Sequence, residues 1–270
     1  MKVLAYFPII LCYIISISCI SYCQGSTPDL KITVRQTSLG HSSQTTQYWS
    51  GENSRSEMQY ESRGVKGHHQ ANIHRRGADK IRVYEVDLDT KKYVSYQTDL
   101  RGTIPHPKPV AINPSGKTLM INISSEDTGE RKEMFGLQAK HIITREKRVA
   151  EPGSCYEGGG ESETDGWYVD FNIFPEWQRP KGDGIAVGMV GGHQCSDKIE
   201  VHRSGPRPGF PLLAKTTFTR ELTQADGSSR TYTSTSETKV VELSQAPIDA
   251  HLFMVPKNFK KVNSLGDPTD

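Results

Sequence analysis

Apolar and polar residues alternate along most of this chain, and the clearest example runs from Ile81 to Tyr96. Apolar side chains recur at every second position in two short runs, and the polar turn Asp89–Lys92 separates them. A period of two residues is typical of a strand with one face on a core, and a short polar turn is typical of an antiparallel connection. The stretch therefore predicts a β-hairpin.

The same alternation predicts strands along the rest of the chain. They are expected at residues 29–36, 45–49, 55–60, 71–73, 118–124, 131–135, 138–146, 167–174, 196–202, 210–222 and 230–243. Tyr48 and Trp49 are adjacent and should point to opposite faces of the sheet. Glu126–Gly129 is expected to be the turn of a hairpin between 118–124 and 131–135.

Helical patterns are almost absent. No window of twelve residues has a 3.6-residue period, and the one helical candidate is Ile248–Phe253, directly after Pro247. The predicted fold is mostly β: a single antiparallel, half-open or curved β-barrel or sheet with few short helices.

The composition fits such a sheet and excludes one class of partner. A hydrophobic fraction of 34% and a mean hydropathy of −0.57 suit strands that each have one solvated face. The formal net charge is only +2, and the 33 basic residues are scattered among 31 acidic ones. Binding to nucleic acid requires a concentrated basic stripe, so nucleic acid is not expected as a partner.

The first 23 residues are predicted to be a signal peptide. Lys2 supplies the positive charge, residues 3–20 are apolar, and small side chains precede a cut before Gln24. One alternative is an uncleaved anchor, because the apolar run is close to the length of a membrane span. Another is a lipoprotein acylated on Cys19 or Cys23. The protein is expected in the periplasm or outer envelope, with residues 24–270 forming one β-rich domain.

Export determines how the cysteines are interpreted. Three of the five lie in the leader, which leaves Cys155 and Cys195. Two cysteines in an oxidising compartment are expected to form a disulfide, and two free thiols are the alternative. The bond would close a glycine-rich segment, at about 150–196, that is expected to be an insertion into the β domain.

Four segments of the mature chain carry a resemblance: Arg55–Met58, Asp87–Tyr93, Thr128–Ile143 and Pro247–Val262. Together they resemble a family of exported bacterial proteins of unknown function, the DUF4412 type, which is similar to the lipoprotein-carrier (LolA/LolB-like) superfamily. The resemblance covers about a third of the mature chain. It implies a half-open antiparallel barrel around a hydrophobic cavity, with a lipid or a lipoprotein acyl chain as the partner.

Residues with metal-binding or catalytic chemistry are present but form no recognised motif. His68, His69 and His74 could bind a metal, but the sequence shows no acidic or cysteine partner at ligand spacing, so a solvated loop is expected and no metal or other cofactor is predicted. His141 lies in an alternating strand and is expected to hydrogen-bond a neighbour. The acidic group Glu161, Glu163 and Asp165 is expected to be solvated.

Three functions remain open. The leading hypothesis is a non-catalytic envelope protein that binds a lipid or other apolar ligand in a curved β-sheet cavity. The candidate cavity residues are Val34, Met58, Val83, Met120, Ile142, Leu213 and Phe218. The alternatives are an envelope protein-interaction module that uses exposed strand edges, and a carbohydrate-active hydrolase with Asp165 and Asp170 or Glu176 as acid and base. The oligomeric state is left open.

Overall fold

The computed structural model describes residues 29–62, 65–99, 113–155, 159–170, 195–223 and 228–266. The predicted signal peptide, with Cys19 and Cys23, lies outside these residues, as does Glu176. The side chain of Cys195 is also outside the description.

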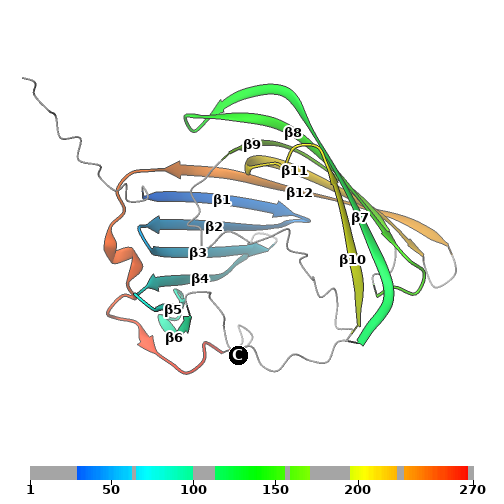
Figure 1. Cartoon of the computed structure of the whole chain (residues 1–270). Helices are drawn as coiled ribbons and strands as arrows, with labels where there is room; N and C mark the ends of the chain where they lie inside the picture. The colour runs from blue at the N-terminus through cyan, green and yellow to red at the C-terminus, as the bar shows by residue number, and fades with distance from the viewer. Residues whose placement is uncertain are drawn as a thin grey trace, which may run out of the picture.

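The described residues form one sheet of 13 strands. The sheet is curved and open, as Figure 1 shows. The order across the sheet is β10-β7-β8-β9-β11-β12-β1-β2-β3-β4-β5-β6-β13. Neighbours are antiparallel except for β10 with β7 and β6 with β13, which are parallel. The prediction of a mostly β, curved and unclosed sheet is confirmed.

In chain order the strands are β1 (Leu30–Ser38), β2 (His41–Ser50), β3 (Asn53–Ser62), β4 (Val65–Arg76), β5 (Lys80–Asp87), β6 (Lys92–Asp99), β7 (Asn113–Met134), β8 (Leu137–Ala150), β9 (Gly160–Val169), β10 (Cys195–Ser204), β11 (Phe210–Thr223), β12 (Ser229–Ser244) and β13 (Lys260–Lys261).

The first six strands form a meander of hairpins, and the predicted hairpin over Ile81–Tyr96 is its last member. The face of the hairpin that is buried changes partway along β5. Ile81 and Val83 are buried at odd positions, whereas Val86 is buried at an even position and pairs with Ala71 of β4. The hairpin therefore buries side chains on both faces of the sheet.

Strand β7 corrects the predicted hairpin at Glu126–Gly129. The chain does not turn there, because β7 is one strand of 22 residues with an irregularity in its pairing to β8 between Asp127 and Arg131. The turn lies at Phe135–Gly136, where both residues have positive φ values of 52° and 73°. Two such residues between paired strands make the turn typical of tight hairpins.

Strand β9 lies inside the segment expected to be an insertion, yet it is a central strand of the sheet. It pairs with β8 on one side and β11 on the other. Deleting the segment from 150 to 196 would therefore remove an interior strand of the sheet.

Two main hydrophobic clusters lie on opposite faces, as the adjacent pair Tyr48 and Trp49 predicts. The first contains Leu30, Ile32, Trp49, Ala139, Val169, Leu212 and Val240. The second contains Ala71, Ile73, Val86 and Phe253, with Tyr48 packed against it. Trp49 and Tyr48 thus belong to different clusters, and the prediction for this pair is confirmed.

The helical candidate near the C-terminus is a single 3-10 turn, η2 (Ala250–Phe253). The side chain of Asp249 accepts a hydrogen bond from the His251 N–H and begins the turn. Phe253 is only 3% exposed and completes the second cluster. Among the described residues, no helix has the length and apolarity needed to cross a membrane.

Candidate functional site

A hollow of about 860 Å³ lies over five neighbouring strands, β10, β7, β8, β9 and β11. Cross-strand pairing explains which side chains line it, since residues directly opposite each other in a sheet point to the same face. Two complete rows of paired residues cross the five strands. One row is His202, Asn122, Lys147, Glu161 and Thr219, and the other is Ser204, Ser124, Arg145, Glu163 and Thr217.

The side chains of both rows are polar, and the charged ones pair across β8 and β9. Lys147 Nζ lies 2.7 Å from Glu161 Oε1, and Arg145 Nε lies 2.8 Å from Glu163 Oε2. All four side chains are more than half exposed, so these pairs add little to stability. The two rows therefore present hydroxyl, amide and paired charged groups to solvent, and Ile123 also lines the hollow.

The predicted cavity residues do not form one surface. Val34 packs against the first cluster, whereas Ile142 is fully buried with Tyr168 and Ala214 in a third, small cluster. Val83 is buried in β5, while Met58 and Met120 are 48% and 38% exposed. None of the seven predicted residues is among the described residues that line the hollow.

The last two of the seven, Leu213 and Phe218, lie on β11 and are half-buried. A register shift between Pro211 and Leu213 disturbs the alternation of this strand. Leu212 is consequently the fully buried residue, and Leu213 is not. The strict period of two used in the sequence interpretation does not hold across such an irregularity.

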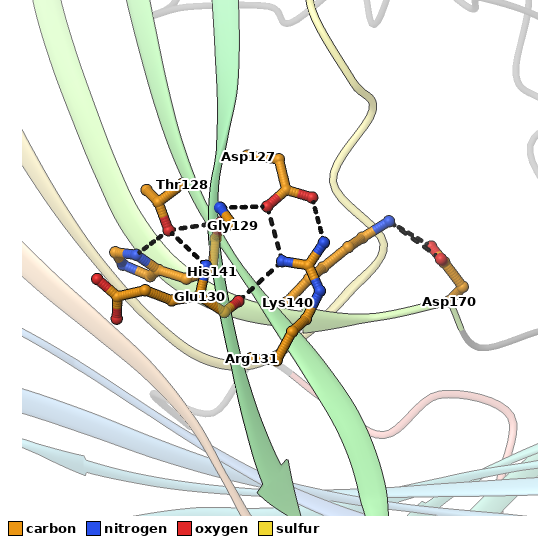
Figure 2. A network of polar contacts seen from close by, with 8 residues as sticks. All are labelled: Asp127, Thr128, Gly129, Glu130, Arg131, Lys140, His141 and Asp170. Atoms are coloured by element: carbon orange, nitrogen blue, oxygen red, sulfur yellow. Dashed lines mark hydrogen bonds and ion pairs between the residues drawn. The ribbon is translucent and has the colours of Figure 1, made fainter.

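His141 hydrogen-bonds its neighbours, as its position in a strand predicts. Its Nε2 lies 2.8 Å from Asp165 Oδ1, and its Nδ1 lies 3.0 Å from Thr128 Oγ1. Its ring stacks on Trp167 with centroids 4.9 Å apart. The Thr128 hydroxyl also accepts the N–H of Glu130, within the irregular part of β7 that Figure 2 shows.

This chain of carboxylate, imidazole and hydroxyl resembles a catalytic relay only in composition. Thr128 Oγ1 lies within 3.4 Å of three groups, which are the His141 ring, the His141 carbonyl and the Glu130 N–H. Beside it, Asp127 accepts hydrogen bonds from the Gly129 N–H and from two nitrogens of Arg131. These contacts hold the irregular backbone between residues 127 and 131, and we assign the network that structural role.

The carboxylates of the hydrolase hypothesis have separate partners. Asp165 contacts His141, whereas Asp170 contacts Lys140 Nζ at 2.8 Å. The third candidate, Glu176, lies outside the described residues. In the described part of the chain, the two aspartates therefore pair with different side chains and are not arranged as an acid and a base on one substrate.

The three histidines expected on a loop lie on β4 and have different surroundings. His68 faces Asp87 and Asp89, with 3.5 Å between the nearest nitrogen and oxygen in each case. His69 faces Glu57 at 3.8 Å. Burial lowers the pKa of His74, so its neutral form is favoured. Both aspartates come from the next strand and its turn, so the spacing of residues along the sequence does not reveal them.

Cys155 lies beside the beginning of β10. Its backbone N–H donates to Asp197 Oδ1 at 2.9 Å, and Asp197 is two residues after Cys195. The contact brings Cys155 near the strand that begins with Cys195. The pairing itself stays a prediction.

Comparisons with known proteins do not assign the chain to a group. No family model matches it, and no curated protein matches it.

Proposed function

We propose that this protein is a non-catalytic binding protein of the cell envelope, and that the hollow over β10, β7, β8, β9 and β11 is its ligand-binding surface. The observation that carries the proposal is the pair of polar rows that cross all five strands within one hollow of about 860 Å³. A hollow of this volume suits a ligand of small-molecule size.

The chemistry of the rows defines the ligand class. Each charged pair and each hydroxyl would lose its water when covered, and this loss is offset only by a ligand that forms hydrogen bonds. The ligand for this hollow is therefore polar and rich in hydroxyl or phosphate groups, such as a glycan segment or a lipid head group. An acyl chain alone would remove the water around Lys147, Glu161 and their neighbours and would supply no hydrogen bonds in its place.

The role in the envelope is the same as in the leading sequence hypothesis, but the polar part of the ligand is recognised and not its apolar part. The carrier resemblance leads to an apolar ligand, and that hypothesis stays a prediction. The apolar-ligand hypothesis and the polar-ligand proposal agree for a lipid that is bound through its head group. They differ for a free acyl chain, which the rows do not favour.

The test is native mass spectrometry of protein expressed with its own leader and recovered from the envelope. In the blocked variant, Thr217→Trp places a large side chain in the hollow. The matched control is Thr231→Trp on β12, at an exposed position that does not line the hollow. We expect a retained polar adduct on the wild type and on the control, and its loss from Thr217→Trp.

Two outcomes would contradict the proposal. Retention of the adduct by Thr217→Trp would place the ligand elsewhere. A retained fatty acid without a polar head group would favour the apolar cavity.

The second candidate function is a protein-interaction module, and one observation favours it. Strand β10 is the last strand at its end of the described sheet, and residues 201–204 of this strand are exposed. Such an edge offers unpaired backbone groups to a strand of another protein. A photo-crosslinker at Arg203 should then capture one envelope protein, and the same probe at exposed Thr231 should not.

A further inference from the structure

A second group of polar side chains converges at the end of β4 and β5, on strands that do not contribute to the hollow. Gln70 pairs with Asp87, so the alternating positions His68 and Asp89 lie on the same face as Asp87. One potential ligand atom from each of His68, Asp87 and Asp89 lies within 4.8 Å of the other two. An imidazole and two carboxylates are the donor types that bind divalent metal ions in proteins.

The backbone explains why His68 reaches this position. The register between β3 and β4 shifts between Gln59 and Glu61, opposite the segment that contains Gly67. A Cβ atom on Gly67 would lie 3.0 Å from the carbonyl oxygen of Tyr60. A glycine there lets the two backbones approach, and such irregularities commonly redirect the neighbouring side chain.

Asp87 is held as a preorganised carboxylate. Its side chain is 5% exposed, and its Oδ1 accepts the N–H groups of Asp89 and Thr90 at 3.0 and 2.8 Å. The other oxygen, Oδ2, faces His68. Carboxylates that bind metal ions are typically oriented by hydrogen bonds from neighbouring protein groups.

The distances from His68 to the two carboxylates are long for direct ion pairs. Oδ2 of Asp87 lies 3.5 Å from His68 Nε2, and Oδ2 of Asp89 lies 3.5 Å from His68 Nδ1. A charge-assisted hydrogen bond would bring such atoms to about 2.8 Å. The two contacts involve different nitrogens of the ring, so one ion would bind a single ring nitrogen together with both carboxylates, whose ligand atoms all lie within 4.8 Å.

We propose that His68, Asp87 and Asp89 bind a first-row divalent metal ion, with Zn²⁺ or Mn²⁺ as the fitting class. His68 would bind through one ring nitrogen, and its side chain is 32% exposed, which leaves room for the ring to turn. Three protein ligands leave at least one position for water. The site is independent of the ligand proposed for the hollow.

The test is isothermal titration of the full-length protein, first treated with a chelator, with ZnCl₂ and separately with MnCl₂. The variants are His68→Gln and Asp87→Asn. Asparagine retains an oxygen for the Asp89 and Thr90 N–H groups and removes the charged Oδ2, so the turn is preserved. The matched control is His251→Gln, because His251 forms an exposed pair with Asp249 at 2.9 Å that lacks a second carboxylate.

We expect one ion to bind per chain, with affinity at least tenfold weaker in both site variants and unchanged in His251→Gln. We also expect the ion to raise the melting temperature of the wild type but not of His68→Gln. The absence of saturable binding by the wild type would overturn the proposal. Equal affinity in the wild type and in His68→Gln would overturn it as well, because the ion would then bind elsewhere.

Discussion

The backbone of Gly209 lies against the carbonyl group of Val169, so closely that a Cβ atom on residue 209 would be 2.1 Å from the Val169 oxygen. The contact joins the end of β9 to the residue before β11, where Val169 pairs with Phe210. Val169 and Phe210 both contribute to the first hydrophobic cluster. A glycine at position 209 thus permits the approach that places these two side chains together.

Gly209→Ala is expected to destabilise the protein by about 1–3 kcal/mol, because the added methyl group would push two backbone segments apart. Urea unfolding measures the change in free energy. Gly77→Ala is the control, since a Cβ atom there would lie 3.3 Å from its nearest neighbour, the Lys80 oxygen. If both variants unfold at the same urea concentration, the close approach has no energetic importance.

Arg55 connects the sheet to the C-terminal segment. Its side chain is 7% exposed, its Nε donates to Glu57 at 2.6 Å, and its Nη1 donates to the Leu252 carbonyl at 2.9 Å. Arg55→Met should cost about 1–3 kcal/mol, because both acceptors would lose a donor. It should also increase hydrogen exchange in residues 248–259. Arg82→Met, at an exposed position of β5, should leave that exchange unchanged.

The half-buried imidazole of His74 makes stability depend on pH. Because burial lowers the pKa of His74, the unfolded chain binds a proton more readily than the folded chain below about pH 6.5. Stability should therefore fall as the pH is lowered through that range. His74→Gln should reduce this fall in melting temperature between pH 7 and pH 5. An identical fall in the variant would show that other groups cause the acid sensitivity.

A disulfide between Cys155 and Cys195 would close a loop of about 40 residues and stabilise the fold by roughly 3–4 kcal/mol. We expect the mature protein to be two hydrogen masses lighter than its reduced form, and its melting temperature to fall on reduction. Alkylation of both thiols without prior reduction would contradict the pairing. The same spectrum identifies the N-terminus and any acyl group on Cys19 or Cys23.

Short-range pattern alone predicted most of the strands. Alternation identified the Ile81–Tyr96 hairpin, and adjacency placed Tyr48 and Trp49 on opposite faces. It also indicated that His141 would contact a neighbour. These features depend on residues a few positions apart, whose relation is set by the two-residue repeat of a strand.

Irregular pairing limited what the pattern could predict. The side-chain contacts of Asp127 and Thr128 keep β7 continuous where a turn was expected, and the register shift in β11 buries Leu212 instead of Leu213. An irregularity of one residue reverses the alternation beyond it, and the apolar pattern does not reveal where it occurs.

The sequence by itself determined the fold class and most of the strands, whereas the tertiary structure decided which strands are neighbours. The insertion of β9 between β8 and β11 creates the two polar rows, and the register of β4 with β5 brings His68 to Asp87 and Asp89. Both sites combine residues from different strands. Their assembly depends on long-range pairing, which is selected by the burial of the whole sheet and not by any one segment.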